Sequence, residues 1–117
     1  APRRGGTSLV PRGAGGGTRR DVALGVATDL RSASAEAFRQ LRTNLLYASA
    51  QQPTRTLMVT SAREDEGKTS VATSLAISFA QQRLRVLLVD CDLLKSRLSS
   101  IFDLPADAPG LRQVLLE

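Results

Sequence analysis

The residues best suited to chemistry lie in a short polar loop, residues 62–69, which reads Ala-Arg-Glu-Asp-Glu-Gly-Lys-Thr. Its spacing matches a P-loop pattern with Ala in place of the usual first Gly. In such a loop, backbone N–H groups and the start of the following helix point at phosphate oxygens. Gly67 permits close approach, Lys68 suits the β- and γ-phosphates, and Thr69 offers a hydroxyl to Mg²⁺. The predicted nucleotide-binding residues are Ala62, Arg63, Glu64, Asp65, Glu66, Gly67, Lys68, Thr69 and Ser70.

A second chemical feature is a pair of acids, Asp90 and Asp92, which follow the apolar run of residues 86–89. The polar loop follows another apolar run, residues 57–59. Because the carboxyl ends of parallel strands meet at the edge of an open α/β sheet where ligands bind, we expect both features to share one crevice.

These features are positioned by a predicted βαβ unit: a strand over residues 56–61, a helix over residues 68–82 and a strand over residues 85–90. The fold class is therefore α/β, a P-loop NTPase-like parallel sheet with flanking helices and a right-handed crossover. Two strands are too few for a stable sheet of this class, so we expect the chain to be truncated after the second strand. The structural alternative is a plain strand-to-helix turn; the second strand with its acids favours phosphate binding.

An earlier helix is predicted to run to about residue 50, capped by Ser32 or Ser34. Beside its apolar face, a polar stripe recurs every three residues and consists of Glu36, Arg39 and Arg42. From spacing alone, this stripe is either a solvated face with one i,i+3 ion pair or an interface. Short helical stretches are also predicted over residues 95–102 and from residue 111.

The net charge of +5 in the 117 residues is concentrated at the start, because residues 1–20 hold five Arg and no acid. Removing these five from the 16 basic residues leaves 11, equal to the 11 acidic ones. Because residues 21–117 are neutral overall, they lack the excess of positive charge typical of a nucleic-acid-binding surface, and we expect no nucleic-acid partner. The composition predicts that residues 1–31 are a basic disordered linker, or the remnant of a cleavable tag because residues 9–13 look like a thrombin-type site. A basic segment beside an anionic membrane surface is the alternative.

Three features of the sequence bear on the compartment in which the protein works. No apolar run approaches the roughly 20 residues of a transmembrane helix. No apolar signal-peptide region follows the Arg-rich start. The single Cys91 rules out an internal disulfide and fits a reducing compartment.

Three motifs in this order resemble the bacterial tyrosine kinases of capsule and exopolysaccharide synthesis (CpsD/CapB type). They are Glu-Ala-Phe-Arg-Gln-Leu-Arg at residues 36–42, Val-Thr-Ser-Ala with Glu-Gly-Lys-Thr at residues 59–69, and Val-Leu-Leu-Val-Asp-Cys-Asp at residues 86–92. The resemblance covers about residues 32–116. It implies that residues 32–117 are the N-terminal part of a P-loop kinase domain, the ATP-binding portion of a tyrosine autokinase regulating exopolysaccharide or capsule synthesis.

The resemblance also implies roles. Residues 62–69 correspond to the Walker A motif and residues 86–92 to Walker A′, with ATP and Mg²⁺ as cofactors. The implied catalytic residues are Lys68, Asp90 and Asp92, and the implied metal ligands are Thr69, Asp90 and Asp92. Glu36, Arg39 and Arg42 match the ExxRxxR motif of subunit contacts, which implies a homo-oligomer. The implied partner is a membrane-embedded polysaccharide co-polymerase or activator. The resemblance also implies that the kinase domain is cytoplasmic and lies at the inner face of the plasma membrane.

The chain departs from this family pattern in both loops. Glu64 and Asp65 stand where the family usually has Pro-Gly, and their charge should weaken triphosphate binding unless they point to water. Leu94 stands at a frequent Arg position, with Lys95 and Arg97 nearby.

Two other functions remain open. A partitioning or division-site type ATPase shares the βαβ core but carries a signature Lys where this chain has Arg63. A truncated, non-catalytic interaction module would oligomerise without binding nucleotide.

Overall fold

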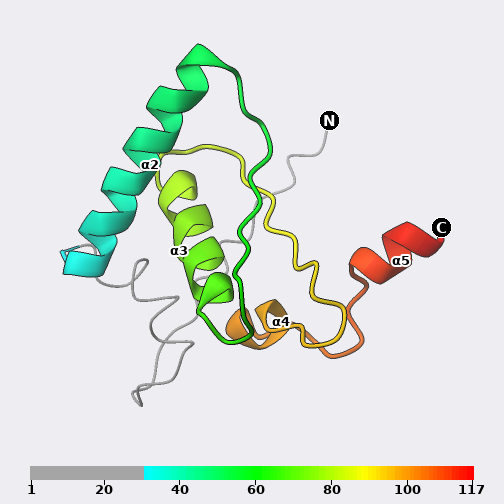
Figure 1. Ribbon diagram of the computed structural model, residues 1–117. Helices are drawn as coiled ribbons and strands as arrows, with labels where there is room; N and C mark the ends of the chain where they lie inside the picture. Colours follow the sequence, from blue (N-terminus) through cyan, green and yellow to red (C-terminus); the bar gives the residue numbers. More distant parts are fainter. Residues whose placement is uncertain (1–30) are drawn as a thin grey trace.

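The computed structural model describes residues 31–117, in which four helices are joined by long extended segments (Figure 1). The helices are α2 (Ala33–Gln51), α3 (Lys68–Ala80), α4 (Leu98–Ile101) and α5 (Leu111–Leu116). In this part of the chain, none of the helices combines the length and apolarity needed to cross a membrane. The expectations for the basic segment before residue 31 lie outside the described residues.

Helix α2 begins where its sequence predicts. Ser32 is the N-cap: its backbone is extended (φ −65°, ψ 154°), and its Oγ accepts a hydrogen bond of 3.1 Å from the Ala35 N–H. This bond satisfies one of the amides that have no partner inside a helix. Glu36 lies in the first turn, where a carboxylate stabilises the helix dipole. The predicted helix is therefore confirmed, with Ser32 rather than Ser34 as its cap.

Helix α3 starts directly after the polar loop. Its N-cap is Gly67, whose φ of 86° lies in the left-handed region. The first helical hydrogen bond runs from the Val71 N–H to the Gly67 carbonyl at 3.0 Å. The helix ends at Ala80, two residues before the predicted end.

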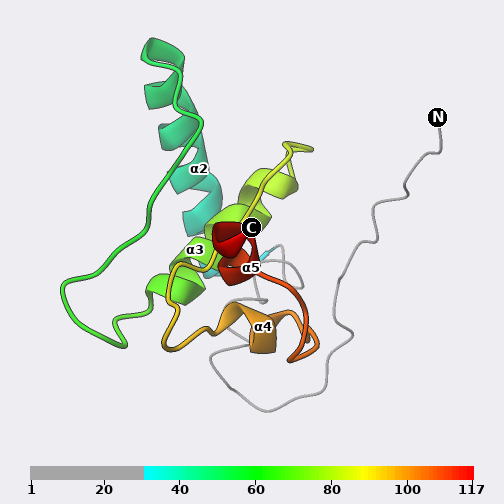
Figure 2. The ribbon, with the colours of Figure 1, turned by 90° about the vertical axis from the view of Figure 1, so that its right-hand side faces the viewer.

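Helices α2 and α3 pack side by side, as both ribbon views show (Figures 1 and 2). Helix α3 buries small and medium side chains, Thr73, Ser74, Leu75 and Ser78, and Ser78 is hydrogen-bonded to Arg42 of α2. On α2, Ala35 and Arg42 are buried. The contact therefore combines close approach of small residues with one long polar side chain.

The predicted parallel sheet is not confirmed. Within residues 31–117, neither residues 56–61 nor residues 85–90 form a paired strand. Both segments are extended and run opposite to α3, so the chain follows a βαβ path without a hydrogen-bonded ladder (Figures 1 and 2). A strand is stabilised by a neighbouring strand and a covered face, and Met58 and Leu87 remain 85% and 87% exposed.

Helix α4 is shorter than the predicted stretch of residues 95–102. The residues before it, 94–97, are held instead in a turn by side-chain acceptors, as described below. Helix α5 matches the predicted start at residue 111.

Candidate functional site

The phosphate loop, which we define as residues 62–67, is exposed throughout and connects the first extended segment to α3. Asp65 and Gly67 have positive φ angles of 59° and 86°. A Cβ at Gly67 would meet no atom within 4 Å, so glycine is favoured there by the backbone angle alone. Asp is one of the few other residues that adopts such angles at moderate cost.

One carboxylate oxygen of the loop accepts hydrogen bonds from two backbone amides of the same loop. Oε2 of Glu66 accepts hydrogen bonds from the Ala62 N–H at 3.1 Å and the Arg63 N–H at 3.3 Å. Consecutive N–H groups that converge on one anionic oxygen are the arrangement that binds phosphate. The contact of Glu66 with the amides was not foreseen from the sequence.

The start of α3 adds further positive potential to the loop. Lys68, Thr69 and Ser70 are half-buried in the first helical turn. The first amides of any helix have no intrahelical acceptor, and the helix dipole favours an anion in front of them. A phosphate group placed before Lys68 would therefore meet both a side-chain cation and free amides.

The first acid of the second motif, Asp90, organises the segment that follows it. Its Oδ1 accepts from the Asp92 N–H at 3.0 Å. Its Oδ2 accepts from the Ser96 hydroxyl at 3.0 Å and from the N–H groups of Arg97 and Leu98 at 3.1 and 3.3 Å. Asp90 thus caps the turn into α4, a role that the sequence, which placed it at the end of a predicted strand, did not indicate.

The second acid, Asp92, accepts the backbone hydrogen bonds of the next turn. Its Oδ1 accepts from the N–H groups of Lys95 at 2.9 Å and Leu94 at 3.2 Å. The pKa of Asp92 is lowered, first by the Lys95 N–H bond and also by the charges of Lys68 and Lys95.

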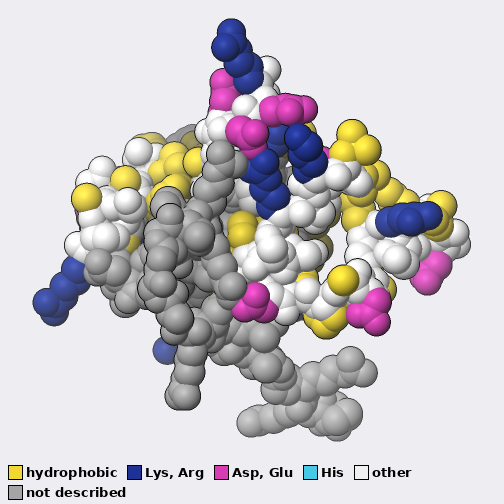
Figure 3. Space-filling model, turned by 90° about the horizontal axis from the view of Figure 1, so that it is seen from below, with side chains coloured by type: hydrophobic (Ala, Val, Ile, Leu, Met, Phe, Trp, Pro, Cys, Tyr) yellow, Lys and Arg dark blue, Asp and Glu magenta, His cyan; other side chains and the backbone are white. Residues whose placement is uncertain are grey.

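Two ion pairs join the phosphate loop to the segment after Asp92. The Lys95 Nζ lies 3.6 Å from Oε2 of Glu64, and the Arg97 guanidinium pairs with the Asp65 carboxylate. The Asp65 hydrogen bond and charge raise the pKa of Arg97. Figure 3 views this end of the molecule and shows acidic and basic side chains side by side. The sequence had indicated Glu64 and Asp65 as nucleotide-binding residues that depart from the family pattern, and Lys95 and Arg97 only as cations near Leu94, so it did not predict that they pair.

The donors for a metal ion are limited. In the described part of the chain, no three His, Cys, Asp or Glu side chains form a group that could hold one. Of the predicted ligands, Asp90 has both carboxylate oxygens hydrogen-bonded, while Asp92 is bonded through Oδ1. Mg²⁺ is commonly held by one or two carboxylates together with substrate phosphates, and the Asp92 carboxylate and the Thr69 hydroxyl are oxygen donors of the kind that Mg²⁺ takes.

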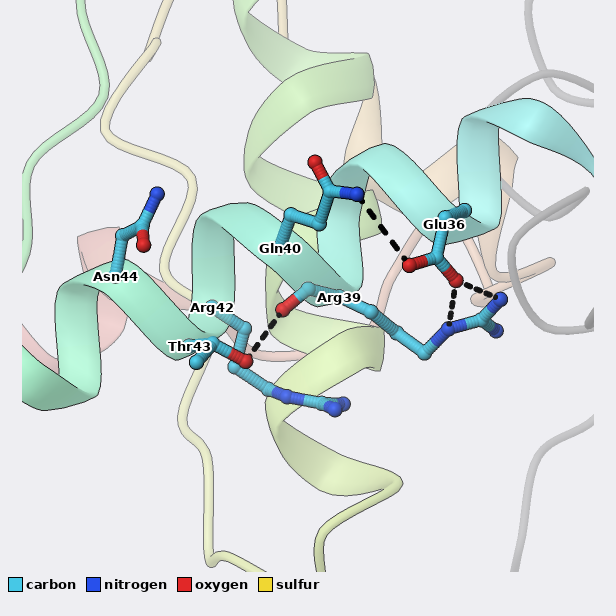
Figure 4. A pocket seen from close by; sticks show the side chains of 6 residues that line it. All are labelled: Glu36, Arg39, Gln40, Arg42, Thr43 and Asn44. Carbon is cyan, nitrogen blue, oxygen red and sulfur yellow. Dashed lines mark hydrogen bonds and ion pairs between the residues drawn. The ribbon is translucent and has the colours of Figure 1, made fainter.

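The polar stripe of α2 is divided by the fold. The Arg39 Nη2 and Nε donate to Oε2 of Glu36 at 2.6 and 2.9 Å, and this exposed contact lowers the pKa of Glu36. Arg42 is instead buried, and its Nη1 donates to the Ser78 carbonyl at 2.6 Å. An open pocket of about 440 Å³ lies along this helix (Figure 4). Its lining residues are Glu36, Arg39, Gln40, Arg42, Thr43 and Asn44.

Comparisons with known proteins show which families this chain resembles. Residues 57–113 match the family described as the CobQ/CobB/MinD/ParA nucleotide binding domain. Tyrosine-protein kinase YwqD of Bacillus subtilis (strain 168) is 41% identical over 90 residues, 77% of this chain and 38% of that protein. Tyrosine-protein kinase CpsD of Streptococcus agalactiae is 38% identical over 80 residues, 68% and 34% of the two chains. Tyrosine-protein kinase wzc of Salmonella typhi is 43% identical over 74 residues, 63% and 10% of the two chains.

The chain spans well under half the length of these curated relatives. No solved structure matches it significantly. The resemblance expected from the three sequence motifs is confirmed. Residues 57–113 are similar to nucleotide-binding domains of the CobQ/CobB/MinD/ParA type, and the chain is similar to parts of several bacterial tyrosine-protein kinases over most of its own length.

Proposed function

We propose that residues 32–117 are the N-terminal, ATP-binding part of a tyrosine autokinase that regulates capsule or exopolysaccharide synthesis, preceded by a basic linker or tag remnant. The observation that carries the proposal is the pairing of two acids of the phosphate loop, Glu64 and Asp65, with Lys95 and Arg97 of the segment that follows Asp92. It supports a single crevice between the phosphate loop and the second acidic motif. The names of the relatives favour a kinase over a partitioning-type ATPase.

In this proposal the triphosphate binds the amides of residues 62–70 and the Lys68 ammonium. Phosphoryl transfer depends mainly on positioning and charge neutralisation, which these groups supply. The Thr69 hydroxyl and Asp92 would hold Mg²⁺, which adds charge neutralisation at the phosphates. Asp90 keeps the turn after it in place through four hydrogen bonds. Glu66 yields the Ala62 and Arg63 amides to phosphate, because a triphosphate carries more charge than a carboxylate.

The proposed assembly is a homo-oligomer that contacts its neighbours through α2 and works with a membrane-embedded polysaccharide co-polymerase or activator. The exposed pair of Glu36 and Arg39, beside the open pocket, supports the α2 contact. Arg42 would contribute indirectly, because its hydrogen bond to Ser78 holds α2 against α3 in the orientation that presents Glu36 and Arg39. The corresponding location is the cytoplasmic side of the plasma membrane.

The site is tested by replacing its cation. We expect Lys68→Met to abolish measurable Mg-ATP binding in calorimetric titration of the full chain. Arg112→Met, on α5, is the matched control that removes one positive charge elsewhere and should bind like the parent. If Lys68→Met binds ATP as tightly as the parent chain does, the site assignment is wrong.

A second experiment separates the kinase from its alternatives. The full chain is incubated with Mg-ATP and a tyrosine-containing peptide, and phosphotyrosine and ADP are both measured. Phosphotyrosine that disappears in Lys68→Met supports the kinase. ADP release without phosphotyrosine indicates the ATPase, and self-association without nucleotide binding indicates the interaction module.

A further inference from the structure

Opposite charges on the two loops of the candidate site face each other in two pairs. Both acids, Glu64 and Asp65, belong to the phosphate loop, and both cations, Lys95 and Arg97, belong to the segment after Asp92. Arg97 and Asp65 are 32 positions apart in the chain, so the pairing is tertiary rather than a neighbour effect. The two segments are therefore connected at two adjacent points.

The cations are held in place by the acidic motif itself. The Lys95 N–H donates to Asp92, and the Arg97 N–H donates to Asp90, so the backbone that carries both cations is fixed by the two carboxylates. On the opposite side, Asp65 adopts a left-handed φ of 59°. Its partner can compensate part of the cost of that backbone angle.

The charge balance of the site depends on these pairs. Residues 62–70 contain two cations and three carboxylates, a net negative loop where a triphosphate should bind. Lys95 and Arg97 bring two further cations against two of the three carboxylates. The third carboxylate, Glu66, is engaged by the amides of Ala62 and Arg63.

We propose that Glu64, Asp65, Lys95 and Arg97 form an ionic clasp that holds the phosphate loop against the segment after Asp92 and turns two carboxylates away from bound phosphate. The four residues are positioning residues, and their effect on nucleotide rests on the proposed function. Exposed ion pairs that act independently contribute little. If the paired side chains hold the loop in place, replacing either partner of a pair should loosen the loop as much as replacing both partners.

The first experiment measures the clasp without nucleotide. Hydrogen exchange of the amides of residues 62–67 is compared among the full-length parent, Asp65→Asn, Arg97→Gln and the double variant. Asn tolerates a left-handed backbone, so Asp65→Asn removes the charge and keeps the loop conformation accessible. We expect each single variant to exchange about two- to fivefold faster, and the double variant no faster than either one. Exchange equal to the parent, or effects that multiply in the double variant, would overturn the clasp.

The second experiment measures its effect on Mg-ATP affinity. Arg97→Gln removes the guanidinium that pairs with the Asp65 carboxylate beside the phosphates, so we expect binding about two- to fivefold weaker than in the parent. Adding Asp65→Asn to Arg97→Gln should restore part of that loss. Arg112→Gln, a charge-matched change on α5, should leave affinity and exchange as in the parent. Unchanged affinity in Arg97→Gln would overturn the proposed effect on nucleotide.

The second ion pair is tested in the same way with Glu64→Gln, Lys95→Met and the double variant. Each single variant should exchange the amides of residues 62–67 faster than the parent, and the double variant no faster than either one. The outcomes also separate the clasp from the function. Loss of ATP binding in Lys68→Met with no effect of Arg97→Gln refutes the clasp and leaves the nucleotide site standing. A parent chain that binds no ATP but shows the coupled exchange refutes the function and leaves the clasp standing.

Discussion

The Arg42 guanidinium donates a hydrogen bond of 2.6 Å to the main-chain carbonyl of Ser78 and so joins α2 to the last turn of α3. It also donates to the Ser78 hydroxyl at 3.2 Å. Helix α3 has no basic residue in its own last turn. Because a cation at the C-terminus of a helix is stabilised by the helix dipole, Arg42 supplies from α2 what α3 lacks in sequence.

Replacing Arg42 should therefore destabilise the helix pair. We expect Arg42→Gln to lower the free energy of unfolding by about 1–3 kcal/mol, because the buried Ser78 carbonyl loses its donor. Arg42→Lys keeps the charge and should lose less. Urea denaturation followed by circular dichroism measures the change, and Arg39→Gln on the exposed face is the control. An unfolding midpoint of Arg42→Gln equal to that of the parent would show that the contact contributes nothing.

The exposed half of the stripe should behave differently from the buried half. If α2 is the contact between subunits, Arg39→Ala should weaken self-association while leaving the unfolding midpoint nearly unchanged. The reason is that an exposed ion pair contributes little to the free energy of folding. Analytical ultracentrifugation over a concentration series measures the association. The proposed α2 interface is refuted if the parent associates and Arg39→Ala associates equally well.

Gly67 is expected to be intolerant of a side chain. Its φ of 86° costs an L-residue roughly 1–2 kcal/mol, although a Cβ at this position would meet no atom within 4 Å. Gly67→Ala should lower thermal stability by that amount and weaken Mg-ATP binding, because the start of α3 must shift. Gly110→Ala, at an extended φ of −141°, is the matched control. Equal losses in the two variants would contradict the role of the backbone angle.

The Ser32 cap gives a third stability prediction. Ser32→Ala removes the acceptor of the Ala35 N–H and should lower stability by about 1 kcal/mol. Ser34→Ala, inside the first turn of α2, serves as the control because Ala is a better helix former. Helical circular dichroism during urea titration measures both. A larger loss in Ser34→Ala would mean that the helix begins at a different residue.

The Glu36 carboxyl should titrate at a pH below its ordinary value. The hydrogen bond from Arg39, followed by the charge of Arg39, lowers its pKa in the folded chain. Its contribution to stability is therefore present above the unfolded pKa of 4.5 and is lost as the pH falls through the folded value. Carboxyl NMR shifts recorded against pH measure the midpoint. Arg39→Gln should raise that midpoint toward the ordinary value, and an unchanged midpoint would contradict the ion pair.

Local interactions explain what the sequence alone determined. The cap at Ser32, the course of α2 and the start of α3 at Gly67 depend on residues within one helical turn of each other, and a sequence pattern contains all of these partners. The loop spacing likewise indicated nucleotide binding, and three motifs in order indicated the resemblance to bacterial tyrosine kinases, which the comparisons confirmed.

Tertiary structure decided which polar residues meet. The spacing of Arg42 made it equivalent to Arg39, yet packing of α2 on α3 buries Arg42 and leaves Arg39 with Glu36. Asp90 became a cap for a turn up to eight residues away, and Asp65 met Arg97 across 32 positions. The two predicted strands do not pair in residues 31–117. A strand is stabilised by hydrogen bonds to a neighbouring strand, and a local sequence pattern does not determine whether that neighbour is in place.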